Sequence, residues 1–351
     1  MPNFATEVAG VSLDFEAIPD LQPKAIRGIL RVQRLPEENV LRNAIATVPV
    51  SDKLFKARID DMVSLAMTPE VNINADDPMV SDTWRWRSDQ VHEYRQAAKI
   101  NREIGRQLLA EDGSPARYAG QSELNRLISR IVIYIDNRRE YNRAMAVSNA
   151  YEFDPARKSD LKKTNVIDIV SEDDKWDNPA TDGGGILKVN PFHQLGAATN
   201  RLAFITGKNP DSLIVTPDVL TALENHSSSA TEIRPGTRPG ARYFIRGLNV
   251  YVSQGKKNIG TQEKPNIAPL FQNQAIICSL DSETIAENQY DVNRVEQFVT
   301  ADRLFYYIRF WHNSKVHVSR PQNFMYITNV LNTPYEFPDV SSLYDTGELP
   351  Y

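Results

Sequence analysis

Residues 122–146, with the sequence SELNRLISRIVIYIDNRREYNRAMA, form the longest stretch of the chain with one regular pattern. Apolar side chains recur every three or four residues, as on one side of a helix, and arginines occupy the other side. We predict a helix capped by Ser122 and about 37 Å long. Because it is about twice the usual helix length, we expect it to lie across a sheet. The predicted apolar face consists of Leu124, Leu127, Ile128, Ile131 and Ile135, opposite Arg126, Arg130, Arg138 and Arg139.

The composition is that of an ordinary globular protein. The chain has 351 residues, of which 41% are hydrophobic and 24% charged, and its net charge is −5. That length favours roughly two domains, and a protein that holds nucleic acid through its phosphates usually carries a basic excess instead. Asp136 and Glu140 also interrupt the arginines of the predicted helix, which favours a salt-bridged surface over a nucleic-acid contact. The single cysteine, Cys278, lies in an apolar run, so we expect a buried, unreactive thiol and a reducing compartment.

Motifs for catalysis are missing. The sequence contains no phosphate-binding loop, zinc-protease, serine-hydrolase or paired-cysteine motif, and its five histidines are scattered. The acidic group around Trp176, at Glu172–Asp174 and Asp177, has the oxygen ligands for a divalent cation, but it lacks the spacing of a calcium loop and favours a solvated turn. We predict no enzyme activity, no catalytic residue, no cofactor and no metal site. No apolar stretch approaches the roughly 18 residues of a membrane span, and we expect a soluble, intracellular protein.

The first hundred residues predict extended structure. Residues 1–49 hold short apolar clusters broken by prolines, so we expect an arm that lies on another surface. Thr83–Arg87 alternates aromatic and basic residues, as a strand with one apolar face does. This alternation also suits base stacking, but the negative net charge favours a cross-strand or inter-subunit contact through Trp84 and Trp86. A polar stretch at Met67–Pro78 precedes it, and we expect Val50–Ser88 to lie over a neighbouring subunit.

The rest of the chain predicts an α/β middle and a β-rich end. Residues 227–242 form a loop rich in proline and glycine that carries Arg234, Arg238 and Arg242. The predicted regular elements are strands at 166–170 and 213–215, helices at 191–206 and 217–226, a hairpin around Gly247, and strands at 303–311 and 323–330.

The middle of the chain resembles the major capsid proteins of tailed bacteriophages. In that family a W-x-[DN]-like turn precedes an amphipathic helix, a P-[ND]-x-L-[IV]-[VLM] strand and a helix that ends near L-x-x-H. Trp176, Pro191–Gly207, Pro210–Val215 and Leu220–His226 follow that order here. The helix 122–146 stands where the family has its spine helix, and the resemblance covers nearly the whole chain.

The resemblance implies the α+β HK97-like capsid fold. The implied parts are an N-terminal arm (1–49), an extended E-loop region (50–100), a peripheral P-domain (101–188 and 291–351, with the C-terminal tail) and an axial A-domain (189–290). It implies a head protein that self-assembles into pentamers and hexamers of an icosahedral shell around double-stranded DNA, without sequence-specific binding and without a membrane. The implied partners are scaffolding, portal and cement proteins, and the implied location is the virion, assembled in the host cytoplasm.

The resemblance also implies where copies meet. We expect loop 227–242 to sit at the centre of pentamers and hexamers, with little packing of its own. Its arginines, Arg234, Arg238 and Arg242, would then need carboxylates such as Glu224 or Glu232 of adjacent copies. Two alternatives stay open: an encapsulin-like compartment shell with the same fold, and a carboxylate-based hydrolase on an α/β core.

Overall fold

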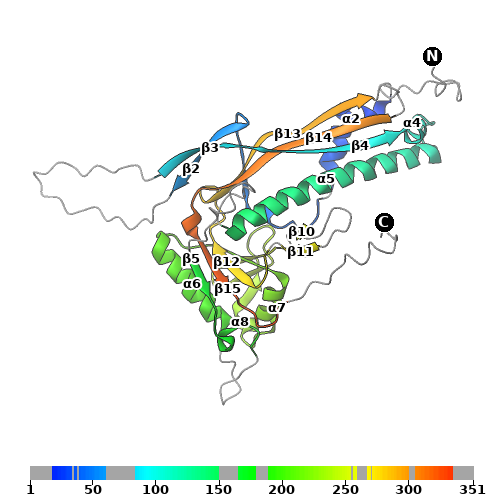
Figure 1. Ribbon diagram of the computed structural model, residues 1–351. Helices are drawn as coiled ribbons and strands as arrows, with labels where there is room; N and C mark the ends of the chain where they lie inside the picture. The colour runs from blue at the N-terminus through cyan, green and yellow to red at the C-terminus, as the bar shows by residue number, and fades with distance from the viewer. Residues whose placement is uncertain are drawn as a thin grey trace, which may run out of the picture. The chain divides into compact units, whose positions relative to one another are not determined.

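The computed structural model has the mixed α+β architecture that the sequence predicts (Figure 1). It forms two compact units: the first comes from Met1–Pro36, His92–Arg138 and Tyr290–Ser314, and the second from the remaining segments. The residues that the structure describes are 18–33, 35–37, 39–60, 84–149, 165–178, 189–253, 256–258, 267–269, 271–299 and 305–334.

The long helix, α5 (Pro115–Asn149), begins seven residues before the predicted start. Ser114 rather than Ser122 caps it, because the Ser114 Oγ accepts the backbone N–H of Arg117 at 3.2 Å. In the first unit, α5 packs its predicted apolar face against strand β14 (Phe305–Val318). Leu124, Ile128 and Ile131 are buried with Tyr306, Ile308 and Phe310, which confirms the predicted packing of the helix on the C-terminal sheet.

The sheet under α5 has the strand order β1-β13-β14-β4. Its other strands are β1 (Ala46–Pro49), β13 (Ile285–Val299) and β4 (His92–Asn101). Aromatic and basic side chains alternate along the face away from the first unit's core. The Arg95 guanidinium lies 3.9 Å from the centre of the Trp311 ring, and Lys99 Nζ lies 3.4 Å from that of Phe305. Such cation–π contacts let aromatic rings remain half-exposed on a solvated sheet face.

The predicted arm is partly helical, and its described part packs on other elements of the same chain. Ile18, Leu21 and Ile26 are fully buried in the core of the first unit. The sequence hid this because the apolar positions sit in elements that are too short to show a period. The short elements are η2 (Pro19–Leu21), α2 (Pro23–Val32), α3 (Leu41–Ala44) and, further on, α4 (Arg102–Leu108).

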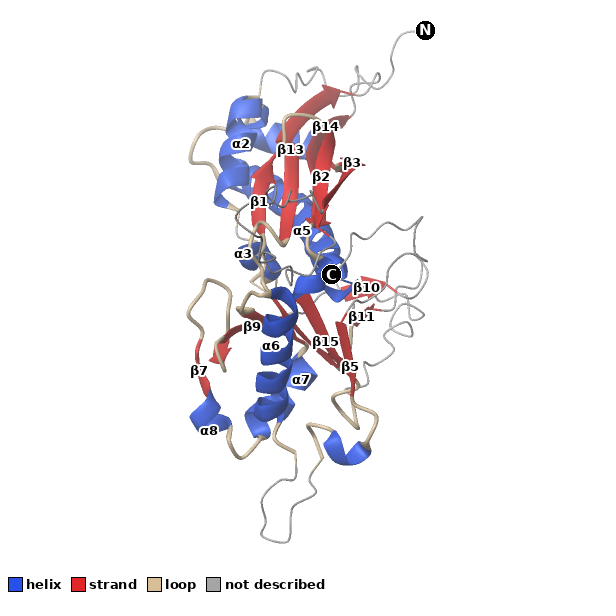
Figure 2. Ribbon diagram, turned by 90° about the vertical axis from the view of Figure 1, so that its left-hand side faces the viewer, coloured by secondary structure: helices blue, strands red, loops and turns tan. Residues whose placement is uncertain are grey.

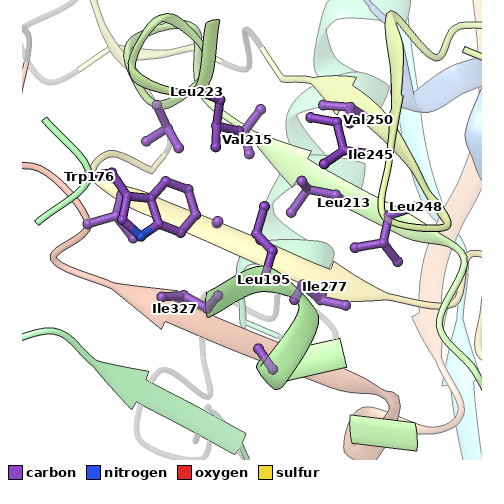
Figure 3. Packing of buried hydrophobic residues seen from close by; sticks show 14 of the residues in the cluster. Trp176, Leu195, Leu213, Val215, Leu223, Ile245, Leu248, Val250, Ile277 and Ile327 are labelled. Atoms are coloured by element: carbon purple, nitrogen blue, oxygen red, sulfur yellow. The ribbon is translucent and has the colours of Figure 1, made fainter. Parts of the chain in front are cut away.

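The second unit is built on a seven-stranded sheet of order β5-β15-β12-β6-β9-β8-β7. Alternate residues of each strand point to opposite faces. Leu213 and Val215 pack under α6 (Pro191–Thr206) and α7 (Pro217–Asn225) (Figure 3). Ile214 joins the core on the other face. The strands are β5 (Asn165–Asp168), β15 (Phe324–Thr328), β12 (Gln274–Cys278), β6 (Ser212–Val215), β9 (Leu248–Val252), β8 (Tyr243–Ile245) and β7 (Ile233–Pro235).

Helix α6 has the predicted bounds because its end signals are local. Asn190 Oδ1 accepts the N–H groups of Phe192 and His193, and Gly207 ends the helix with a φ of +66°. Helix α7 starts at Pro217 as predicted, although the Thr216 side chain makes no capping bond. The hairpin around Gly247, whose φ is +88°, is also confirmed.

Strands β2 (Leu54–Asp60) and β3 (Trp84–Gln90) pair antiparallel, with Asp60 opposite Trp84 and Arg58 opposite Trp86. This confirms the strand prediction for Thr83–Arg87 from Trp84 onward. Residues 61–83, and with them the Met67–Pro78 excursion, lie outside the described residues, as does the tail from residue 335. The remaining small elements are η4 (Glu172–Asp174), α8 (Ser229–Glu232), β10 (Lys256–Asn258), β11 (Ile267–Pro269) and η5 (Pro321–Asn323).

Cys278 is fully buried on β12, as predicted. Burial raises the pKa of its thiol well above the usual range, and Asp211 and Asp281 add to this by their negative charges. Since the thiolate is the reactive form, we expect Ellman's reagent at pH 8 to leave the folded protein unlabelled and to label one thiol per chain in guanidinium. Ser171→Cys, a variant in an exposed turn, is the positive control. Prompt labelling of Cys278 in the folded protein would contradict its burial.

In the described part of the chain, no helix combines the length and apolar character needed to cross a bilayer.

Candidate assembly surfaces

The seven-stranded sheet ends in two strands, β5 and β7, each of which pairs on one side only within the described residues. Figure 2 shows them on opposite sides of α6. An end strand leaves backbone N–H and C=O groups available to another chain. A neighbouring chain could therefore pair with either end without disturbing the core of this unit.

The β7 end is basic and more ordered than the sequence predicted. Residues 227–242 were expected to be loop throughout, but they contain α8 and β7, and β7 pairs with β8 so that Arg234 lies opposite Phe244. Residues 229–247 carry four arginines and one glutamate, a net charge of +3. Arg234 is exposed on the end strand and makes no ion pair with the described residues.

The remainder of this loop folds back onto its own chain. The N–H and Oγ1 of Thr237 both donate to the Oδ1 of buried Asn249, at 3.0 and 2.8 Å. Gly240 has a φ of +79°, and a Cβ there would lie 3.1 Å from Asn43 Cβ. Glycine permits that close approach. The expectation that the loop has little packing of its own is therefore wrong.

The other predicted arginines already have partners within the chain. Arg238 Nη1 lies 2.7 Å from Asp211 Oδ2, and Arg242 Nη2 lies 3.5 Å from Glu224 Oε1. Glu232 pairs with Arg246 in the same way. The expectation that Glu224 and Glu232 of adjacent copies supply the missing charge is corrected, because both pair inside the chain. These are exposed pairs, which leave the arginines accessible to a further anion and contribute little to stability.

The β5 end carries the opposite charge. Residues 165–178 hold five acidic residues and one lysine, a net charge of −4. The acidic turn η4 projects Glu172, Asp173 and Asp174 as exposed side chains, and none of the three makes an ion pair with the described residues. Beside them, Val170 is 82% exposed and Val166 is 43% exposed, so this end also presents apolar side chains to solvent.

Two buried residues hold the acidic turn in place. The ammonium of Lys175 donates to the carbonyl oxygens of Ile169, at 2.7 Å, and of Asn329. The Trp176 indole N–H donates to Gln194 Oε1 at 2.7 Å. Asp177, which the sequence grouped with the turn, instead accepts the backbone N–H groups of Asn332 and Thr333 at 2.7 and 3.0 Å. The carboxylates therefore occupy a fixed position, and the described residues contain no cluster of three metal-ligating side chains.

The last turns of α5 contain a buried ionic cluster where the sequence predicted a salt-bridged surface. Arg143 is fully buried and donates to Glu140 Oε2 at 3.1 Å and to Glu287 Oε2 at 2.6 Å. Arg139 reaches the other oxygen of Glu287 at 2.7 Å, and Glu140 Oε1 accepts the N–H of Leu41 at 2.8 Å. The expectation of a solvated face is wrong here, because these pairs join α5, β13 and the residue that begins α3. Asp136 is also buried.

Trp84 and Trp86 lie on β3, but their side chains fall outside the described residues. Their role in an interface stays a prediction.

No family model matches the chain, and no curated protein matches it either. Solved structures do match. A phage-related protein from Bordetella bronchiseptica aligns with a TM-score of 0.56 and 13% identity, over 88% of this chain and 97% of the other. The capsid of a native GTA particle aligns with a TM-score of 0.52 and 10% identity, over 84% and 91%. The chain has the HK97-like capsid fold.

This HK97-like fold confirms the architecture that the sequence resemblance implied. An encapsulin complex from Synechococcus elongatus also matches, with a TM-score of 0.46 and 10% identity, over 95% of this chain and 97% of the other.

Proposed function

We propose that this protein is a major capsid protein that assembles into pentamers and hexamers of an icosahedral shell around double-stranded DNA. The observation that carries the proposal is the HK97-like fold, which extends over 88% of the chain in the alignment with the phage-related protein. The charged, open ends of the seven-stranded sheet supply surfaces on which copies can associate. The net charge of −5 also suits a container that must not bind the packaged DNA tightly.

Within this proposal, residues 1–49 are the arm, 50–100 the extended loop, 189–290 the axial domain, and 101–188 with 291–351 the peripheral domain and tail. Helices α6 and α7 and strands β6 to β9 of the axial segment support that assignment. Trp84, Trp86, Arg234, Arg238 and Arg242 are proposed to face neighbouring copies. Scaffolding, portal and cement proteins are the proposed partners, the virion is the proposed location, and the proposal includes no enzymatic role.

Electron microscopy of the purified full chain tests this function. We expect closed particles of uniform size, with or without a co-expressed scaffolding protein. A chain that stays monomeric under all assembly conditions would contradict the proposal. Particles that co-purify with an enzyme from the neighbouring genes would instead identify the compartment shell, and particles that incorporate portal protein and fill with DNA would support the phage head.

A further inference from the structure

The second unit has two open ends of opposite charge on one sheet. The β5 end carries a net charge of −4 over residues 165–178, and the β7–β8 end carries +3 over residues 229–247. Both ends face solvent, and they lie on opposite sides of α6 (Figure 2). The chain, whose net charge is −5, thus carries opposite charges at the two ends of one sheet.

Ring symmetry gives this separation a consequence. Copies related by rotation around an axis meet head to tail, so each copy needs two different, complementary surfaces. A two-fold pair would instead bring like surfaces together. Here a contact between two β5 ends places three carboxylates against three carboxylates. A contact between a β5 end and a β7–β8 end places the carboxylates against arginines instead. Like charges across an interface are costly and opposite charges attract, so the charge pattern favours the head-to-tail contact.

We infer that the β5 end of one copy binds the β7–β8 end of the next copy around a capsomer axis, with Glu172, Asp173 and Asp174 facing Arg234 and its neighbouring arginines. This inference rests on the proposed shell function and adds the pairing of surfaces to it. The acidic turn supplies an anionic partner for Arg234, which makes no ion pair with the described residues, since Glu224 and Glu232 already pair with Arg242 and Arg246. The exposed Val170 and Val166 beside the turn give the contact an apolar part that charge alone would not supply.

Charge reversal on each side tests the pairing. The acidic-end variant is Glu172→Lys with Asp173→Lys and Asp174→Lys, and the basic-end variant is Arg234→Glu with Arg242→Glu. We expect each variant to fold and to need at least about tenfold more protein to assemble than the unmodified chain. Arg201→Glu is the matched control, because Arg201 is exposed on α6 away from both ends. Circular dichroism and thermal midpoints report folding, and sedimentation and microscopy report assembly.

Combining the two sets of changes makes the test specific to the pairing. A chain that carries all five substitutions should again assemble, because its ends are complementary with the signs exchanged. An equimolar mixture of the two single-end variants should form rings with alternating members. Such alternation closes with six copies but not with five, so we expect sheets or tubes of hexamers and few closed shells.

The outcomes separate this inference from the proposed function. If the unmodified chain forms shells and the single-end variants assemble as well as Arg201→Glu, the inference is wrong and the proposed function stands. If neither the chain with all five substitutions nor the mixture of the two single-end variants recovers assembly, the two ends do not face each other. If the unmodified chain never assembles, the proposed function itself fails, and the pairing fails with it.

A second measurement needs no variant. Exposed ion pairs weaken with ionic strength, because the Debye length falls from about 10 Å at 0.1 M to about 3 Å at 1 M salt. We expect capsomers of the unmodified chain to dissociate at least about tenfold more readily across that range. Association that is unchanged or stronger in salt would overturn the pairing.

Discussion

Glu287→Ala is expected to lower the thermal midpoint by about 6 °C or more, the equivalent of about 3–5 kcal/mol for a broken buried pair. Glu287 is 1% exposed, and its two carboxylate oxygens accept from Arg139 and Arg143 at 2.6–3.0 Å. Removing the carboxylate takes away one of the two acidic partners of the fully buried Arg143 guanidinium, the other being Glu140. Differential scanning calorimetry under non-assembling conditions measures the change.

The matched control is Glu123→Ala, on an exposed turn of the same helix. Glu123 pairs with Arg126, and the hydrogen bond from Arg126 lowers the pKa of the Glu123 carboxyl. Solvent screens that pair, so we expect a shift of less than about 2 °C. Equal shifts for the two variants would show that the cluster around Glu287 is solvated, against its observed burial. A larger loss in Glu287→Ala than in Glu287→Gln would further show that shape as well as charge is needed.

Local sequence signals account for the parts of the fold that were predicted correctly. Helix α6 starts at a capping asparagine followed by a proline and ends at a glycine, so local sequence signals determine where it begins and ends. The apolar face of α5 was predictable for the same reason, because five spaced leucines and isoleucines define it. The start of α5 was misplaced because Ser122 and Ser114 are both good caps, and only the preceding turn selects the second.

Long-range partners account for what the sequence did not reveal. The spacing of Glu140 and Arg143, three residues apart, occurs both on solvent-exposed helices and in buried ionic clusters, so the spacing alone does not predict burial. Here burial depends on Glu287, which lies 144 residues beyond Arg143. The arginines of residues 227–242 were recognised as a group, but their partners Asp211 and Glu224 come from other elements of the sheet unit. The acidic turn is solvent-exposed, as the sequence predicts, but only the sheet order shows that it and Arg234 lie at opposite ends of the same sheet.

Ile131→Asp tests the spine of the first unit and should abolish soluble expression. Ile131 is 3% exposed, among Leu124, Ile128 and the aromatic and aliphatic side chains of β14. Burying one such side chain contributes roughly 1.5–3 kcal/mol. The aspartate loses that contribution and also places an ionised carboxylate in an apolar seam, where burying it costs several kcal/mol more. Ile131→Val keeps the apolar contact, and we expect it to remain soluble.

Arg130→Ala is the comparison that assigns the faces of α5, because Arg130 is the exposed neighbour of Ile131 on the same turn. Removing its side chain should leave the yield and the thermal midpoint nearly unchanged, and any defect should appear in particle formation. Soluble yield, calorimetry and microscopy on the three variants separate the two effects. A folded Ile131→Asp protein together with an unfolded Arg130→Ala protein would invert the faces, and the packing of α5 on the C-terminal sheet would then have to be rejected. The buried row from Leu124 to Ile131 leads us to expect the opposite result, with folding lost on the apolar face and assembly affected on the basic one.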